Sequence, residues 1–172
     1  MRLEQLNALS ADAAVAELLR CCGSTRWARM MTSARPFGTA DEMLAAADRI
    51  WPALGPDDWL EAFRAHPRIG ESGGAGGSGE SSTGGSRDWS DQEQSGVRTA
   101  RDAVRDRLAE GNRHYEARFG YIFIVCATGR SAEEMLAMLE RRLTNHPDDE
   151  LRIAAEEQRT ITRLRIAKLL TL

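Results

Sequence analysis

The sequence has few cysteines, and none in a pattern typical of a disulfide framework or a thiolate zinc site. Among its 172 residues are three cysteines, Cys21, Cys22 and Cys126. The number is odd, two are adjacent, and no Cys-x-x-Cys occurs. This pattern argues against both kinds of cross-link. We therefore expect ordinary buried thiols and a reducing compartment, the cytoplasm.

Long apolar runs and basic blocks are also lacking. No apolar stretch is long enough to span a bilayer, and the first residues lack the apolar core and cleavage site of a secretory signal. The formal net charge is −3, and lysine and arginine are spread along the chain. We therefore expect neither a membrane nor a nucleic acid as partner.

The usual signatures of metal and nucleotide sites are missing as well. The sequence has no His-Glu-x-x-His, no Gly-x-Ser-x-Gly and no pair of histidines at metal-binding spacing. Its glycine-rich tract does not end in Lys-Ser or Lys-Thr, so it is not a phosphate loop. We expect no metal and no organic cofactor. His114 and His146 are interpreted as surface or cap residues.

What the sequence does contain is helical periodicity over most of its length. Hydrophobic residues make up 42 % of the chain, enough for a core. The pattern predicts an all-α fold, a single domain over residues 1–172 with about seven to nine helices. The predicted starts and breaks are an N-cap at Ser10, an end at Gly23, a cap at Ser24, a break at Pro36, a capping box of Thr39 with Glu42 for a helix to about Trp51, a start at Pro56, an end near Ala65 or His66, a start at Ser90, an interruption near Gly111, an end at Gly120, a capping box of Ser131 with Glu134, a break at Asn145 to Pro147 and a last helix from Asp148.

Two stretches do not fit that periodicity. Residues 72–87 include seven glycines and five serines, and such a tract cannot bury enough apolar surface to offset the entropy of ordering. We expect a flexible loop there. Tyr121 to Ala127 is the one strongly apolar, β-branched run, too short for a helix and without a second such run to pair with. It is predicted to be an extended, buried segment.

His66 is the first candidate for acid–base chemistry. It lies where a helix is expected to end, directly before Pro67, and an imidazole can exchange a proton near neutral pH. The alternative is a helix C-cap, where a cationic histidine interacts favourably with the dipole. Position alone favours the cap.

Glu93 is the second candidate. Ser90-x-x-Glu93 is by itself a capping box, which is the simpler interpretation. If that helix start faces a cleft, its free N–H groups favour an anion or a small polar ligand beside Glu93 and Gln94. Arg141 and Arg142 end a later helix, and either could bind a carboxylate in a bidentate manner.

Several segments, in this order, are shared with a known family. They are Arg35-Pro36-Phe37, Trp59 to Phe63, His66-Pro67-Arg68-Ile69-Gly70, Ser90-x-x-Glu93-Gln94-x-Gly96, Phe119-Gly120 with Phe123 to Ala127, Arg142-Leu143-x-Asn145 and Leu164-Arg165. Over roughly residues 6–170 the chain resembles 2-oxo-4-hydroxy-4-carboxy-5-ureidoimidazoline (OHCU) decarboxylase, which forms (S)-allantoin in urate degradation. The glycine- and serine-rich insert departs from the family pattern.

The resemblance implies an all-α, cofactor-independent enzyme with a ureidoimidazoline substrate, and it suggests a homodimer. It assigns the acid–base role to His66 and an orienting role to Glu93. It also implies substrate contacts, with Arg142 expected to bind the anionic group. Those contacts would come from Pro67, Ser90, Asp91, Gln92, Glu93, Gln94, Phe123, Ile124, Val125, Cys126, Ala127 and Arg142.

Two other functions remain compatible with the residues. The amphipathic helices and the cap interpretations of His66 and Glu93 fit a non-catalytic module that binds a partner helix or a small metabolite. A cofactor-free hydrolase of related ureido compounds is the other. Binding of allantoin near His66 would favour the decarboxylase over the binding module.

Overall fold

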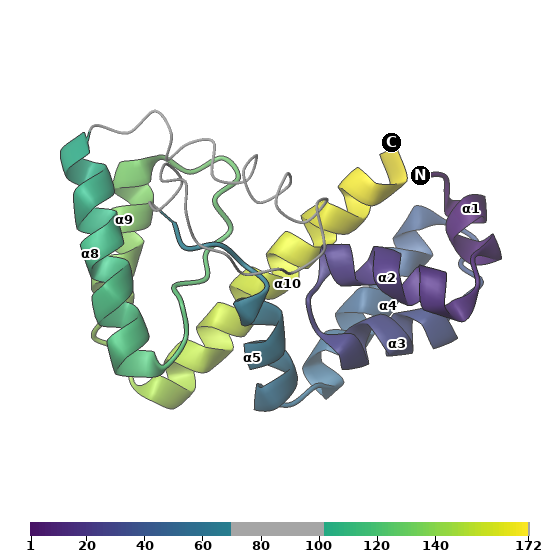
Figure 1. Cartoon of the computed structure of the whole chain (residues 1–172), viewed down its shortest axis with the longest axis horizontal. Coiled ribbons are helices and arrows are strands. Elements are labelled where there is room, and N and C mark those ends of the chain that lie inside the picture. Colours follow the sequence, from purple (N-terminus) through teal and green to yellow (C-terminus); the bar gives the residue numbers. More distant parts are fainter. Residues whose placement is uncertain (70–101, 172) are drawn as a thin grey trace. The chain divides into compact units, whose positions relative to one another are not determined.

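The computed structural model describes residues 1–69 and 102–171, and the regular elements of these residues are helices (Figure 1). They form eight α-helices and one short 3-10 helix, with no strand in either range. The predicted all-α class is confirmed. Residues 72–87 and the helix start predicted at Ser90 lie outside the described residues.

The chain divides into two compact units. One consists of residues 1–65 with 158–172, and the other of residues 66–157. The long helix α10 therefore contributes its first residues to the second unit and the remainder to the first. The expectation of a single domain stays a prediction.

The first unit is built from short helices that begin where the sequence offers a cap. Ser10 and Ser24 each accept a hydrogen bond from the backbone N–H three residues on, and Pro56 occupies the first helical position, where its missing N–H costs nothing. These three starts were predicted. The elements are α1 (Leu3–Ala8), α2 (Ala11–Cys21), α3 (Thr25–Ser33), α4 (Ala40–Ile50), η1 (Trp51–Ala53) and α5 (Pro56–Arg64).

Helix α1 was not predicted, and long-range polar contacts explain its place. Arg35 Nη1 donates to the carbonyls of Leu6 at 2.6 Å and Leu9 at 3.0 Å, so it binds the orphan acceptors at the end of α1. Asn7 and the backbone of Phe37 exchange two hydrogen bonds. The Arg35–Pro36 peptide is cis. The break predicted at Pro36 is thus the anchor of the first helix.

One predicted capping box is only half formed. Thr39 Oγ1 accepts from the Glu42 N–H at 3.1 Å, as expected. The Glu42 carboxylate accepts from Gly38 N–H at 2.7 Å instead of from Thr39. The helix ends at Ile50 and continues as the 3-10 turn η1, so Pro52 lies inside that turn rather than directly stopping α4.

The second unit contains α8 (Asp102–Phe119), α9 (Ala132–Arg142) and the start of α10 (Pro147–Thr171). Figure 1 shows α8 and α9 side by side. The interruption predicted near Gly111 is wrong, because α8 is continuous there. The absence of a side chain at Gly111 allows Leu139 to pack against α8, because a Cβ there would lie 2.5 Å from Leu139 Cδ2.

The connection between α8 and α9 is the predicted extended segment. Gly120 follows α8 with φ +81, a backbone conformation that residues other than glycine rarely adopt. No helix or strand is assigned to residues 121–127, and all except Ile122 are buried. The capping box of Ser131 with Glu134 then begins α9, as predicted. The apolar run is therefore a non-helical strip packed in the core of this unit.

Candidate active site

The structure describes eight of the thirteen predicted site positions. The arm of His66 and Pro67, the segment of Phe123, Ile124, Val125, Cys126 and Ala127, and Arg142 are described. The other five, Ser90, Asp91, Gln92, Glu93 and Gln94, lie outside the described residues. The meeting of His66 with Glu93 stays a prediction.

His66 is the first residue of a short non-helical arm, residues 66–69, that is hydrogen-bonded to α8. His66 is half-buried, and Pro67 is exposed. Arg68 makes a two-pronged ion pair with Glu116, through Nε at 3.0 Å and Nη2 at 2.8 Å. The carbonyl of Ile69 accepts from the buried Asn112 side chain at 3.1 Å. These contacts fix the backbone directly after His66 and so restrict where its ring can lie.

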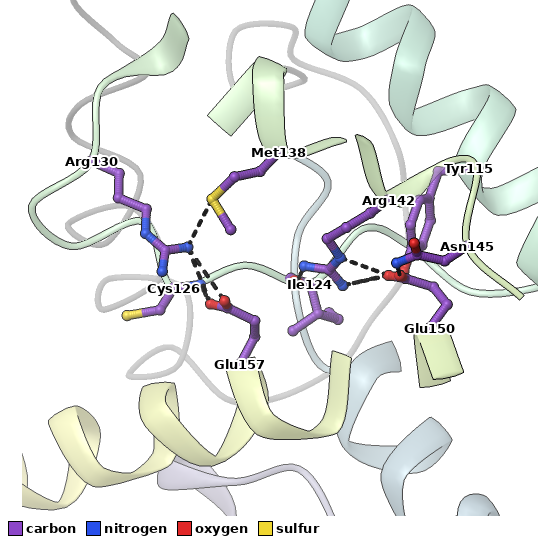
Figure 2. Close-up of polar contacts among 9 residues, drawn as sticks. All are labelled: Tyr115, Ile124, Cys126, Arg130, Met138, Arg142, Asn145, Glu150 and Glu157. Atoms are coloured by element: carbon purple, nitrogen blue, oxygen red, sulfur yellow. Dashed lines mark hydrogen bonds and ion pairs between the residues drawn. The ribbon is translucent and has the colours of Figure 1, made fainter. Parts of the chain in front are cut away.

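The extended segment is held through its backbone. The carbonyl of Ile124 accepts from Arg142 Nη1 at 2.8 Å. The Cys126 N–H donates to the Glu157 carboxylate at 2.7 Å. Figure 2 shows the Glu157 and Arg142 side chains directed at the segment. Both are charge-assisted bonds, which are roughly twice as strong as neutral ones.

Arg142 is buried and bonded to protein groups. Its Nε donates to Glu150 Oε1 at 2.7 Å, and its Nη2 lies 2.6 Å from the same oxygen. Asn145 donates to the other Glu150 oxygen at 2.7 Å, and the Tyr115 hydroxyl also donates to Glu150. Glu150 has no exposed surface. A buried charge pair of this kind is tolerated only because further hydrogen bonds satisfy both partners.

Aromatic rings complete the surroundings of Arg142. Its guanidinium carbon lies 4.7 Å from the centroid of the Phe123 ring, within reach of a cation–π interaction. The Tyr115 ring meets Phe123 edge-on at 5.3 Å between centroids. Burial raises the pKa of Tyr115 well above its usual range, and burial raises that of Tyr121 to about 12. Both phenols therefore remain neutral hydrogen-bonding groups at physiological pH.

A second charged pair supports the other end of the segment. Arg130 Nη1 lies 3.3 Å from Glu157 Oε2 and 3.2 Å from the sulfur of Met138. Glu157 lies on α10, whereas Arg130 lies two residues before the start of α9. Figure 2 shows this pair and the Arg142 pair along the same segment. The segment is thus bonded to two carboxylate–arginine pairs.

Sequence reasoning missed most of these supporting residues. Tyr115, Glu150 and Glu157 were not among the residues predicted to form the site. A faint signal existed, because Glu150 lies in the first turn of α10, where an acidic residue suits the dipole. Nothing in the spacing indicated the long-range partners. His114 and His146 are exposed, and His146 Nδ1 accepts from Asp148 N–H at 3.4 Å.

Three further findings concern only the described part of the chain. In that part, no group of three or more histidine, cysteine or acidic side chains is placed to hold a metal ion. None of its helices combines the length and the apolar character needed to cross a membrane. All three cysteines are buried, and none of them forms a disulfide.

The fold and these contacts define an all-helical protein in which a buried extended segment, held by ion pairs, offers backbone groups suited to a small polar ligand. The family model for OHCU decarboxylase matches residues 7–167. The chain belongs to the OHCU decarboxylase family, which are carboxy-lyases.

Individual relatives agree with this assignment. The chain is 40 % identical over 149 residues to the uric acid degradation bifunctional protein TTL of Arabidopsis thaliana, covering 87 % of this chain but 45 % of that protein. It is 27 % identical over 169 residues to the 2-oxo-4-hydroxy-4-carboxy-5-ureidoimidazoline decarboxylase of Haloferax volcanii, covering 98 % of this chain and 95 % of that one. A crystal structure of OHCU decarboxylase in the presence of (S)-allantoin is similar at TM-score 0.77 and 40 % identity, covering 91 % of this chain and 99 % of that chain.

Proposed function

We propose that this chain converts OHCU to (S)-allantoin and carbon dioxide in urate degradation, with no metal and no organic cofactor. The family membership over residues 7–167 supports this activity. The observation that carries the proposal is the buried segment Phe123 to Ala127, which is held by its backbone and belongs to the same unit as His66. A flat ring rich in amide groups is suited to such fixed main-chain donors and acceptors.

The chemistry requires a sink for electrons and a proton donor. When the bond between C4 and the carboxylate breaks, its electron pair forms a C4=C5 bond, and the displaced pair of the adjacent C5=N unit goes to the nitrogen, which takes up a proton. Protonation of C5 from one face then gives the S product, and the C4 hydroxyl loses its proton to become a carbonyl. We assign the proton transfers to His66 and the orientation of the substrate hydroxyl or ureido group to Glu93.

The residues proposed to bind the substrate are distinct from those that support them. Pro67, the stretch from Ser90 to Gln94 and the segment from Phe123 to Ala127 are proposed to hold the ring and the ureido amides. Arg142 receives a supporting role in place of the direct anionic contact expected from the sequence. All three of its guanidinium nitrogens already bond protein oxygens.

The test is the rate of (S)-allantoin formation, followed by circular dichroism, when the protein is added to freshly generated OHCU. The wild type should accelerate formation over the spontaneous reaction. His66→Ala should lower kcat by about 10²- to 10⁴-fold, the usual contribution of a general acid or base. His114→Ala, which changes an exposed histidine on α8, should leave the rate unchanged. No acceleration by the wild type, or full activity of His66→Ala, would contradict the proposal.

The cellular setting is also part of the proposal. A cytoplasmic location is supported by three buried cysteines that form no disulfide. A homodimer, suggested by the family resemblance, stays a prediction.

A further inference from the structure

Arg142 and Glu157 both form hydrogen bonds to the same edge of the backbone of the segment Phe123 to Ala127. In a trans peptide, the C=O and the N–H point in opposite directions. The Ile124 carbonyl shares a peptide with the Val125 N–H, and the Cys126 N–H shares the next peptide with the Val125 carbonyl. The Ile124 carbonyl accepts from Arg142, and the Cys126 N–H donates to Glu157. One edge is thus directed at α9 and α10.

The opposite edge carries the peptide groups of Val125. Within residues 1–69 and 102–171, neither its N–H nor its C=O has a hydrogen-bond partner. Val125 is nevertheless buried, with 5 % of its surface exposed. A buried peptide group without a partner is costly, and such groups are rare unless a ligand or water completes them. This edge is therefore the one suited to a bound molecule.

Glu157, which bonds Cys126, is held by fewer contacts than Arg142, which bonds Ile124. Arg142 is surrounded by Glu150 and two aromatic rings, so its position is over-determined. Glu157 has 16 % of its side chain exposed and pairs with Arg130 at 3.3 Å. Its 2.7 Å bond to Cys126 N–H fixes the plane of the Val125–Cys126 peptide. That peptide includes the Val125 carbonyl, which faces the other edge.

We propose that Glu157 is a positioning residue for the reaction: by accepting from Cys126 N–H it sets the angle of the Val125–Cys126 peptide, so that the Val125 carbonyl can accept from an amide N–H of the ring or ureido group. This role rests on the proposed function. Glu157 does not touch the substrate or exchange a proton with it. Its loss should weaken binding and leave the proton transfer by His66 intact.

The length of the side chain, rather than its charge, distinguishes this role from a general electrostatic one. Glu157→Gln keeps an acceptor oxygen at the same reach from α10. Glu157→Asp keeps the charge but shortens the side chain by one methylene, which withdraws the acceptor from Cys126. Glu140→Asp is the matched control, since Glu140 forms an exposed pair with Arg107.

The experiment measures the Kd for (S)-allantoin by calorimetry, kcat and KM across pH, and the Cys126 amide proton shift by NMR, all on the full chain. We expect Glu157→Asp to raise Kd and KM about tenfold, as losing a charge-assisted bond does, and to move the Cys126 amide proton upfield. Glu157→Gln should stay within about threefold of the wild type. The shape of the pH–rate profile should be the same in all three proteins, and Glu140→Asp should change nothing.

Two contrary results are distinguishable. If the wild type neither binds allantoin nor speeds its formation, the proposed function fails, and this role fails with it. If the wild type is active and Glu157→Asp matches it in Kd and KM, or leaves the Cys126 amide proton unmoved, only the positioning role is overturned.

Discussion

At the scale of single residues, the buried charges of the second unit have a structural role. Arg142 and Glu150 are both buried, and each is satisfied by more than its ion-pair partner, through Ile124, Tyr115 and Asn145. A buried pair is expensive to desolvate, so it is weak evidence for stability by itself. Its value here is geometric, because one member of the pair bonds the backbone of the segment that we propose binds the substrate.

Cys21 and Cys22 give the fold a stability that should decline in alkaline solution. Both are fully buried, and burial raises the pKa of Cys21 to about 12 and that of Cys22 to about 11. Above the ordinary thiol pKa near 9.0, the unfolded chain loses these protons while the folded chain keeps them. Because the unfolded state then binds fewer protons, the free energy of unfolding falls as pH rises.

We predict that these two thiols remove about 2 kcal/mol of stability between pH 8 and pH 10. Urea unfolding at a series of pH values measures this loss. The double variant Cys21→Ala with Cys22→Ala should show a shallower decline over the same range, whatever its stability at pH 8. Identical slopes for the variant and the wild type would show that the thiols do not carry the effect.

At the scale of the elements, the close approach of α8 to α9 depends on Gly111. Alanine is about 1 kcal/mol better than glycine inside a helix. At this position, however, its Cβ would lie 2.5 Å from Cδ2 of the buried Leu139. Overpacking of this kind typically costs about 1–3 kcal/mol, so the steric term should exceed the gain in helix propensity.

Gly111→Ala should therefore destabilise the protein by about 1 kcal/mol, and in a Leu139→Ala background it should stabilise it by a similar amount. The measurement is a double-mutant cycle of thermal or urea unfolding. A change of the same sign in both backgrounds would exclude the packing explanation for this glycine.

Local signals predicted the elements well and the contacts poorly. Ser10, Ser24 and Ser131 cap the helices they were expected to cap, because a cap depends on residues only three apart. Gly111 was misread because a glycine that breaks a helix and one that admits a neighbour look alike in sequence. Helix α1 was missed because its end is bonded by Arg35, far along the chain.

The candidate site divides in the same way. His66, the segment Phe123 to Ala127 and Arg142 could be named in advance through the family resemblance. Glu157 could not, because the whole of α9 and the start of α10 separate it from its partners Cys126 and Arg130. No spacing rule connects residues that meet only after the chain has folded.

At the scale of the whole molecule, the proposed chemistry draws mainly on the second compact unit. Residues 66–157 contain the His66 arm, the extended segment and both charged pairs. The first unit has its own core, which includes Trp27, Phe63 and the Cys21–Cys22 pair of neighbours. Helix α10 contributes residues to both units, and its Glu150 and Glu157 support the segment.

The central claim is that the Val125 edge of the segment, which has no hydrogen-bond partner among the described residues, binds the reaction product. Titration of the isotope-labelled full chain with (S)-allantoin, and separately with (R)-allantoin, tests it through amide chemical shifts. The account predicts that the Val125 and Cys126 amides shift strongly with the S enantiomer and much less with the R enantiomer. Unmoved Val125 and Cys126 amides at saturating (S)-allantoin, or equal shifts with both enantiomers, would contradict it.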